Sequence, residues 1–127
     1  MDGAPPDDPT IGDDAELWRR VPPLHWVPDA TAAGRRVSSA AFDDPEMSVV
    51  IAAECDGGEA TLLRGHDGFG IARFTAGDVR ALGWSVVRAP LDELPGHANV
   101  LGKKTTGARR KLALQCRVAP EPKAPES

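Results

Sequence analysis

Length, composition and charge set the first limits on this chain. It has 127 residues, 41% of them hydrophobic and 27% charged, with a formal net charge of −4 at pH 7. These values predict one globular domain and argue against a protein that coats long nucleic acid, which is usually basic throughout. No apolar stretch approaches the length that crosses a bilayer, and no basic and apolar leader is present, so we expect no membrane association.

The charges are distributed unevenly along the chain. Residues 1–16 hold six acids and no base, whereas residues 101–117 hold six bases and no acid. Residues 1–14 are rich in aspartate and proline, so we predict a disordered acidic tail there, which folds back transiently onto the basic residues. Proline-rich residues 119–127 predict a second disordered tail. The folded domain is therefore expected over residues 15–118.

The first half of the chain predicts strands and turns. Residues 15–21 fit either a short helix or a strand, and residues 21–29 are held extended or turning by three prolines. Residues 35–42 are a modest strand candidate. Residues 47–54 are a better one, because their β-branched run is continuous, as in a strand covered on both faces.

The second half alternates strands with helices. Strands are predicted over residues 68–74, 84–90 and 97–101, with a short helix over about 75–82 and a basic helix over about 106–116. Strands alone, followed by strands that alternate with helices, predict a single small α+β domain with a mixed sheet.

The short helix carries the clearest local signals. Thr75 can cap it by accepting a hydrogen bond from the backbone N–H of Asp78, whose carboxylate can reach back to the cap. Gly83 supplies the left-handed residue that ends it.

The stretch GHANVLGKKTTGARRKLALQC, residues 96–116, invites comparison with a phosphate loop. That loop needs four residues between its glycines and a hydroxyl directly after the lysine. Here five residues separate Gly96 from Gly102, and Lys103 is followed by Lys104, so a nucleotide triphosphatase is not favoured. Free N–H groups at the helix start, beside basic side chains, still favour an anion. A solvated basic helix with an ordinary threonine cap explains the same residues.

The chain has three histidines. His66 lies in a turn and is expected to be exposed and inert. His25 and His97 lie on rigid backbone, where they could act as acid, base or anion donor or simply pack. The predicted anion site therefore draws on several segments: His25, Arg36, Ser39, His97, Lys103, Lys104 and Arg109.

Other chemistry has little support in the sequence. Cys55 and Cys116 lie far apart beside apolar residues, which predicts reduced, partly buried thiols and a cytoplasmic location. We predict no metal site and no cofactor, because no cysteines and histidines stand at ligand spacing. Ser38 and Ser39 lack the glycines of a nucleophile elbow. No catalytic residue can be named.

Several landmarks occur together along the chain, namely RVSSAAF, EMSVVIA, FTAGDVRALG and PGHANVLGKK. In this order they resemble a group of short bacterial proteins of unknown function, which share SSxAF, MSV and PxHA landmarks. The resemblance spans residues 17–112. It implies one domain over this span with His97 at a strand start, and it implies no catalytic role.

Two functions follow as hypotheses. The first is a small cytoplasmic bacterial protein that acts as a non-catalytic interaction or accessory module for an unknown protein partner. The alternative is an enzyme or sensor that binds a phosphate-bearing small molecule or a nucleic-acid end at the basic strand-turn-helix.

Overall fold

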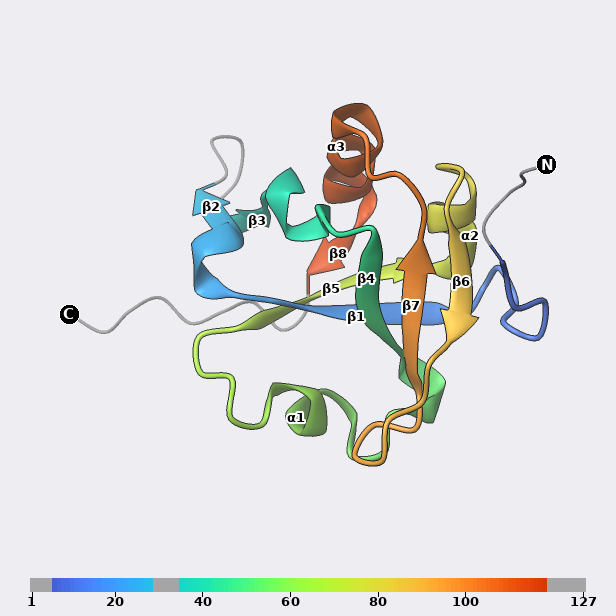
Figure 1. Ribbon diagram of the computed structural model, residues 1–127. Helices are drawn as coiled ribbons and strands as arrows, with labels where there is room; N and C mark the ends of the chain where they lie inside the picture. Colours follow the sequence, from blue (N-terminus) through green and yellow to red (C-terminus); the bar gives the residue numbers. More distant parts are fainter. Residues whose placement is uncertain (1–5, 29–34, 119–127) are drawn as a thin grey trace.

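The computed structural model describes residues 6–28 and 35–118. In this part of the chain, six strands form one sheet in the order β6-β7-β4-β1-β5-β8, and β2 pairs with β3 in a separate ribbon (Figure 1). The strands are β1 Glu16–Val21, β2 Trp26–Pro28, β3 Arg35–Val37, β4 Glu46–Ile51, β5 Gly70–Thr75, β6 Ser85–Arg88, β7 His97–Leu101 and β8 Arg117–Val118. The helices are α1 Gly58–Leu63, α2 Ala76–Arg80 and α3 Thr106–Gln115, and the 3₁₀ turns are η1 Pro23–His25, η2 Ser39–Phe42 and η3 Ala52–Glu54.

The predicted α+β class and single small domain are confirmed, but the predicted mixed sheet is wrong. All strand pairs within the described residues are antiparallel. The alternation of strand and helix suggested parallel crossovers, which need a dozen or more residues. Helix α2 has only five residues, and it leads the chain from β5 to the opposite edge of the sheet, where β6 lies (Figure 1).

Strand β1 settles the helix-or-strand alternative for residues 15–21. It lies inside the sheet and pairs with β5 along its whole length and with β4 near its start. Alternate side chains therefore face opposite sides of the sheet. Leu17 and Val21 join the main core, whereas Trp18 joins a smaller cluster on the other face.

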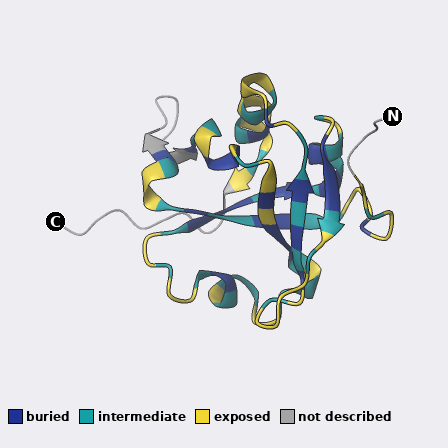
Figure 2. Ribbon diagram, in the orientation of Figure 1, coloured by how far each residue is buried: buried dark blue, intermediate teal, exposed yellow. Residues whose placement is uncertain are grey.

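The two faces of the sheet are covered by different helices. On one face, α2, α3 and η2 cover the main core, in which the rings of Phe42 and Phe74 meet edge to face at 6.0 Å between centroids. On the other face, α1 contributes Leu62 to the cluster that holds Trp18. Figure 2 shows the buried residues concentrated in the strands, while the outer sides of the helices and loops are exposed. The second face is therefore the less completely covered one.

Local signals in the sequence placed α2 and α3 correctly. Thr75 and Asp78 form the reciprocal capping box of α2, and Gly83 follows with a φ of 87°. Thr105 caps α3 by accepting from the backbone N–H of Ala108 at 3.2 Å. Both helices begin where a side-chain oxygen satisfies a free backbone N–H.

Two local predictions fail. The strand expected over residues 35–42 ends at Val37, because the Ser38 hydroxyl accepts from the backbone N–H of Ala40 at 3.2 Å and starts η2. The strand expected over residues 47–54 ends at Ile51 and is followed by η3, and α1, which begins after the left-handed Gly57, was not predicted. A six-residue helix is too short to reveal itself by periodicity.

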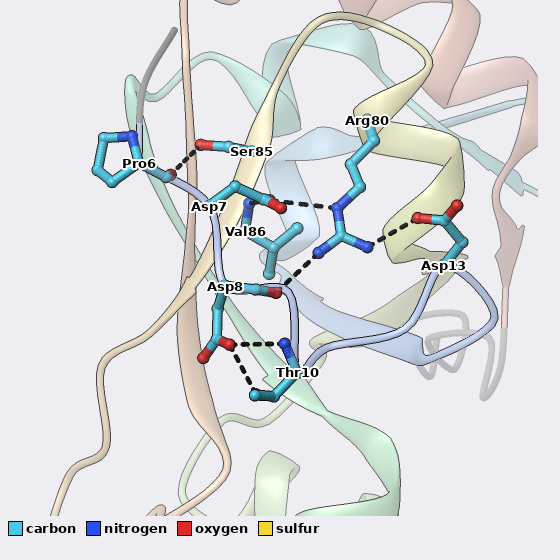
Figure 3. A network of polar contacts seen from close by, with 8 residues as sticks. All are labelled: Pro6, Asp7, Asp8, Thr10, Asp13, Arg80, Ser85 and Val86. Carbon is cyan, nitrogen blue, oxygen red and sulfur yellow. Dashed lines mark hydrogen bonds and ion pairs between the residues drawn. The ribbon is translucent and has the colours of Figure 1, made fainter.

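The N-terminal strap, residues 6–14, corrects the prediction of a disordered tail over residues 1–14; residues 1–5 lie outside the described part. The strap lies against β6 and α2 (Figure 3), and its single large apolar side chain, Ile11, is only 2% exposed. Its carboxylates pair with Arg80 and Arg88. Of the six acids in residues 1–16, Glu16 alone among those described forms an ion pair with the basic stretch 101–117, at 2.6 Å from Arg117. Composition does not predict that the strap packs against the domain, because one buried side chain, Ile11, and two arginines from distant segments hold it.

No helix among the described residues is long and apolar enough to cross a membrane.

Candidate functional site

The predicted anion site at the strand-turn-helix does not have a free lysine pair. Lys104 is only 8% exposed. Its ammonium donates to the carbonyl oxygens of Val100 at 2.9 Å and Gly102 at 3.0 Å, and it lies 4.8 Å from the ring centroid of Trp84. Burial lowers the pKa of Lys104 to about 8, so it is still charged at neutral pH. Its positive charge is satisfied inside the fold, which argues against the predicted role of Lys104 as an anion ligand.

The neighbouring groups are also engaged by the chain itself. Arg109 donates through Nε to the Lys104 carbonyl oxygen at 3.1 Å and through Nη2 to a threonine hydroxyl at 3.2 Å. The Lys103 carbonyl accepts from the indole of Trp84 at 3.0 Å, while the Lys103 side chain is exposed. A side chain at Gly102 would collide with Trp84, because its Cβ would lie 2.9 Å from the ring. The turn is therefore packed around Trp84.

The other predicted residues do not complete a site there. His25 and Ser39 lie in η1 and η2, whose backbones are joined by a 2.8 Å hydrogen bond from Ser38 to His25. The side chain of Arg36, in β3, lies outside the described residues. His97 begins β7, whereas Lys103 follows its end, so at about 3.3 Å per residue at least about 13 Å of strand separates them. His97 thus lies at the opposite end of β7 from Lys103 and Lys104.

A hollow on the less covered face of the sheet brings together different residues. This α1 hollow has a volume of about 370 Å³ and lies among β1, β4, α1 and the loop before β7. A second hollow of about 380 Å³ adjoins it and shares Arg20, His66, Leu91 and Leu94. Clefts of this size accept small organic molecules.

Strand register explains how the hollow is built. Trp18 of β1 pairs with Val50 of β4, which pairs with His97 of β7, so all three lie in one row on the same face. Arg20 lies two residues beyond Trp18 and therefore on that face as well. Helix α1 and the loop side chains Leu91 and Leu94 complete the apolar walls. Antiparallel pairing thus joins residues separated by about 80 positions.

Two arginines, Arg19 and Arg20, line the hollow, and Arg20 is the less engaged of the two. Its Nη1 donates to the Leu62 carbonyl oxygen at 3.1 Å, and within the described residues it forms no ion pair. Burial lowers the pKa of its guanidinium, which nonetheless stays charged at neutral pH. Most of its donors therefore remain available to an anion. Its neighbour Arg19, in contrast, donates to the carbonyl oxygens of Ala41 and Ser48, both at 2.8 Å.

His97 provides a hydrogen-bond acceptor in the hollow, in contrast to the donors of Arg20. Its Nδ1 lies 2.8 Å from the carbonyl oxygen of Ala89. A carbonyl oxygen only accepts hydrogen bonds, so Nδ1 carries the proton, and in the neutral tautomer this leaves Nε2 as an acceptor. The hollow therefore combines a cationic donor, an acceptor and apolar walls.

His66 is not the exposed turn residue that the sequence predicted. Its ring is partly buried, packs against Phe69 at 4.9 Å between centroids and lines the hollow. Arg20 was not among the predicted site residues either, since the hollow depends on which face of β1 each residue occupies. Alternation along β1 would have grouped Trp18 with Arg20, but only once the segment was known to be a strand.

Metal and thiol chemistry find no support in the described residues. No group of three or more metal-ligating side chains gathers there. The thiols of Cys55 and Cys116 are free. Burial raises the pKa of Cys55, and it raises that of Cys116 to about 11, so both remain protonated and poorly nucleophilic at neutral pH.

No protein-family model, curated protein or solved structure matches the chain. The resemblance to short bacterial proteins therefore stays a prediction.

Proposed function

We propose that the protein is a non-catalytic binding module that takes up a small organic anion in the α1 hollow. The observation that supports this most is Arg20, a half-buried cation with no ion-pair partner among the described residues. A charge removed from water is normally compensated by an opposite charge. No carboxylate among the described residues pairs with Arg20, so we propose that a ligand supplies the opposite charge.

The shape and lining of the hollow narrow the ligand. Apolar side chains such as Leu62, Leu91 and Leu94 surround the polar groups, which favours a carboxylate or phosphate ester with a compact apolar part. The acceptor on His97 favours a ligand that also carries a hydroxyl or amine near its charge. The phosphate-bearing ligand of the sequence analysis is thus proposed for the hollow instead of the strand-turn-helix.

A non-catalytic role fits how these side chains are held. Arg20 and His97 are each fixed by a backbone carbonyl, and no nucleophile is hydrogen-bonded to a base among the described residues that line the hollow. Nucleophilic catalysis normally requires such a pair. The sequence composition and free thiols further support our proposal of a cytoplasmic bacterial protein, in which ligand uptake serves an accessory role beside a protein partner.

The test is a thermal-shift and calorimetric screen with defined probes. Phenylacetate and phenyl phosphate should raise the melting temperature, whereas inorganic phosphate should raise it much less because it lacks an apolar part. Arg20→Gln should abolish the rise, while Lys103→Ala, which changes an exposed lysine outside the hollow, should retain it. An equal rise in wild type and Arg20→Gln would refute the site.

A second comparison tests whether His97 accepts a hydrogen bond from the ligand. Mandelate carries a hydroxyl that phenylacetate lacks, so it should bind the wild type roughly three- to tenfold more tightly, the value of one hydrogen bond. His97→Phe should remove this difference but keep binding of phenylacetate. If the two acids bind the wild type equally, His97 is not an acceptor for the ligand.

A further inference from the structure

The free edge of β6 carries a second, independent feature. Among the described strands β6 pairs with β7 alone, so one edge of the sheet ends at β6. The N-terminal strap runs beside this edge (Figure 3). The backbone N–H of Asp8 donates to the Val86 carbonyl oxygen at 2.8 Å. Residues 6–8 therefore take the place of a neighbouring strand.

The strap is an incomplete substitute for a strand. The Val86 N–H donates to the side-chain Oδ1 of Asp7 at 2.9 Å and not to a main-chain carbonyl. Beyond Asp8 the chain turns away, because the Asp8 carbonyl accepts from the N–H of Ile11 at 3.1 Å. In a strand, the main-chain N–H and C=O groups of every second residue point to the same edge. The main-chain groups of Arg88, two residues after Val86, therefore face this edge beyond the end of the substitute strand.

Arginines recognise the acidic character of the strap. Arg80 lies 3.2 Å from a carboxylate oxygen of Asp7 and 2.7 Å from one of Asp13, and it also donates to the Asp8 carbonyl at 3.0 Å. Arg88 lies 3.4 Å from a carboxylate oxygen of Asp8 and is shared with Glu54, whose carboxylate oxygen lies 2.6 Å away. Thr10 donates to that side chain through its N–H at 2.8 Å and its hydroxyl at 2.6 Å. The edge thus combines strand pairing with selection for carboxylates.

The contacts that hold residues 6–8 are open to competition. Asp7 is exposed, and the Asp8 carboxylate bonds within the strap itself. Exposed ion pairs contribute little and weaken with salt. In contrast, Ile11 is buried, so residues 6–8 can leave the edge while the strap stays attached.

We propose that the β6 edge is a strand-addition site for an extended acidic segment of a partner protein, and that residues 6–8 occupy it until the partner displaces them. A longer segment with adjacent carboxylates would keep the contacts to Arg80 and Arg88 and add main-chain pairing at Arg88, which residues 6–8 do not provide. A second copy of the strap offers no such gain, since it would repeat the contacts already made.

The test measures binding of a fluorescently labelled synthetic peptide, Val-Asp-Asp-Val-Thr-Val, to the full chain. Binding is measured by fluorescence anisotropy at low salt. The variant Asp7→Ala with Asp8→Ala frees the edge and should bind this peptide about tenfold more tightly than the wild type, because the tethered competitor is weakened. A peptide with asparagine at both acidic positions should bind poorly. Adding Arg80→Gln to the variant should reduce binding of the acidic peptide.

A second measurement uses the unmodified chain, so that the test does not depend on the folding of the variant. Saturating acidic peptide should slow hydrogen exchange of the Arg88 N–H in the wild type. The proposal fails if neither chain binds the peptide, if the acidic and asparagine peptides bind equally, or if Arg88 exchange is unchanged. Dimerisation of the double variant without peptide binding, measured by light scattering, would instead identify a second copy as the occupant.

Discussion

The basic strand-turn-helix and the α1 hollow both contain cations, but they use them differently. Lys104 lies among backbone carbonyls and against Trp84, and Arg109 is bonded to the turn that follows β7. Arg20 donates to one carbonyl oxygen, that of Leu62, and forms no ion pair within the described residues. The denser cluster of basic residues is therefore part of the scaffold, and the isolated arginine is the better binding candidate.

The largest effect on stability should come from Lys104→Ala. It leaves buried carbonyl oxygens without their donor and removes the contact with Trp84, so the free energy of unfolding should fall by about 2–4 kcal/mol. Urea unfolding measures this. The matched control Lys103→Ala changes an exposed side chain and should stay within about 0.5 kcal/mol of wild type. Equal effects at the two positions would remove the distinction between a structural lysine and a free one.

The pH dependence of stability tests whether the Lys104 ammonium is buried in the folded chain. The pKa of Lys104 is about 8 in the folded chain and about 10.5 in the unfolded chain. Between these values the unfolded state binds more protons, so the free energy of unfolding rises with pH. The difference between wild type and Lys104→Met should therefore increase from pH 8 to pH 10.5 and then level off. A constant difference over this window would show that the ammonium is as accessible as in the unfolded chain.

Adjacent arginines provide a matched pair for the next comparison. Arg19→Met leaves the carbonyls of Ala41 and Ser48 without a donor and should lower the free energy of unfolding by about 1.5–3 kcal/mol. Arg20→Met removes a partly desolvated charge with no ion pair among the described residues, so stability should change by less than about 0.5 kcal/mol. Chemical denaturation of both variants checks this. A larger loss at Arg20 than at Arg19 would make Arg20 a structural residue.

The smallest of these contrasts concerns Arg109. Removing its bond to the Lys104 carbonyl with Arg109→Gln should lower the free energy of unfolding by about 1 kcal/mol. Binding of phenylacetate should be unchanged, because Arg109 lies outside the hollow. Calorimetric titration of the variant measures this. A clear loss of affinity would return the anion site to the strand-turn-helix.

Local signals in the sequence were sufficient for part of the fold. The capping box of Thr75 and Asp78 and the left-handed Gly83 identified α2, and the β-branched run identified β4, because these features act over a few residues. Strand β1 remained ambiguous because its six residues allow either periodicity. The N-terminal strap was misread because composition does not reveal that Ile11 and the acids meet β6 and α2.

For the candidate site, the sequence by itself identified His97 at the start of a strand, since the preceding Pro95-Gly96 turn and the following apolar alternation are local features. Only the tertiary structure decided that Lys104 is buried and that Arg20 lies on the same face as His97. The reason is physical: a side chain's chemistry belongs to the residue, but its burial and partners depend on antiparallel pairing between strands far apart in the chain.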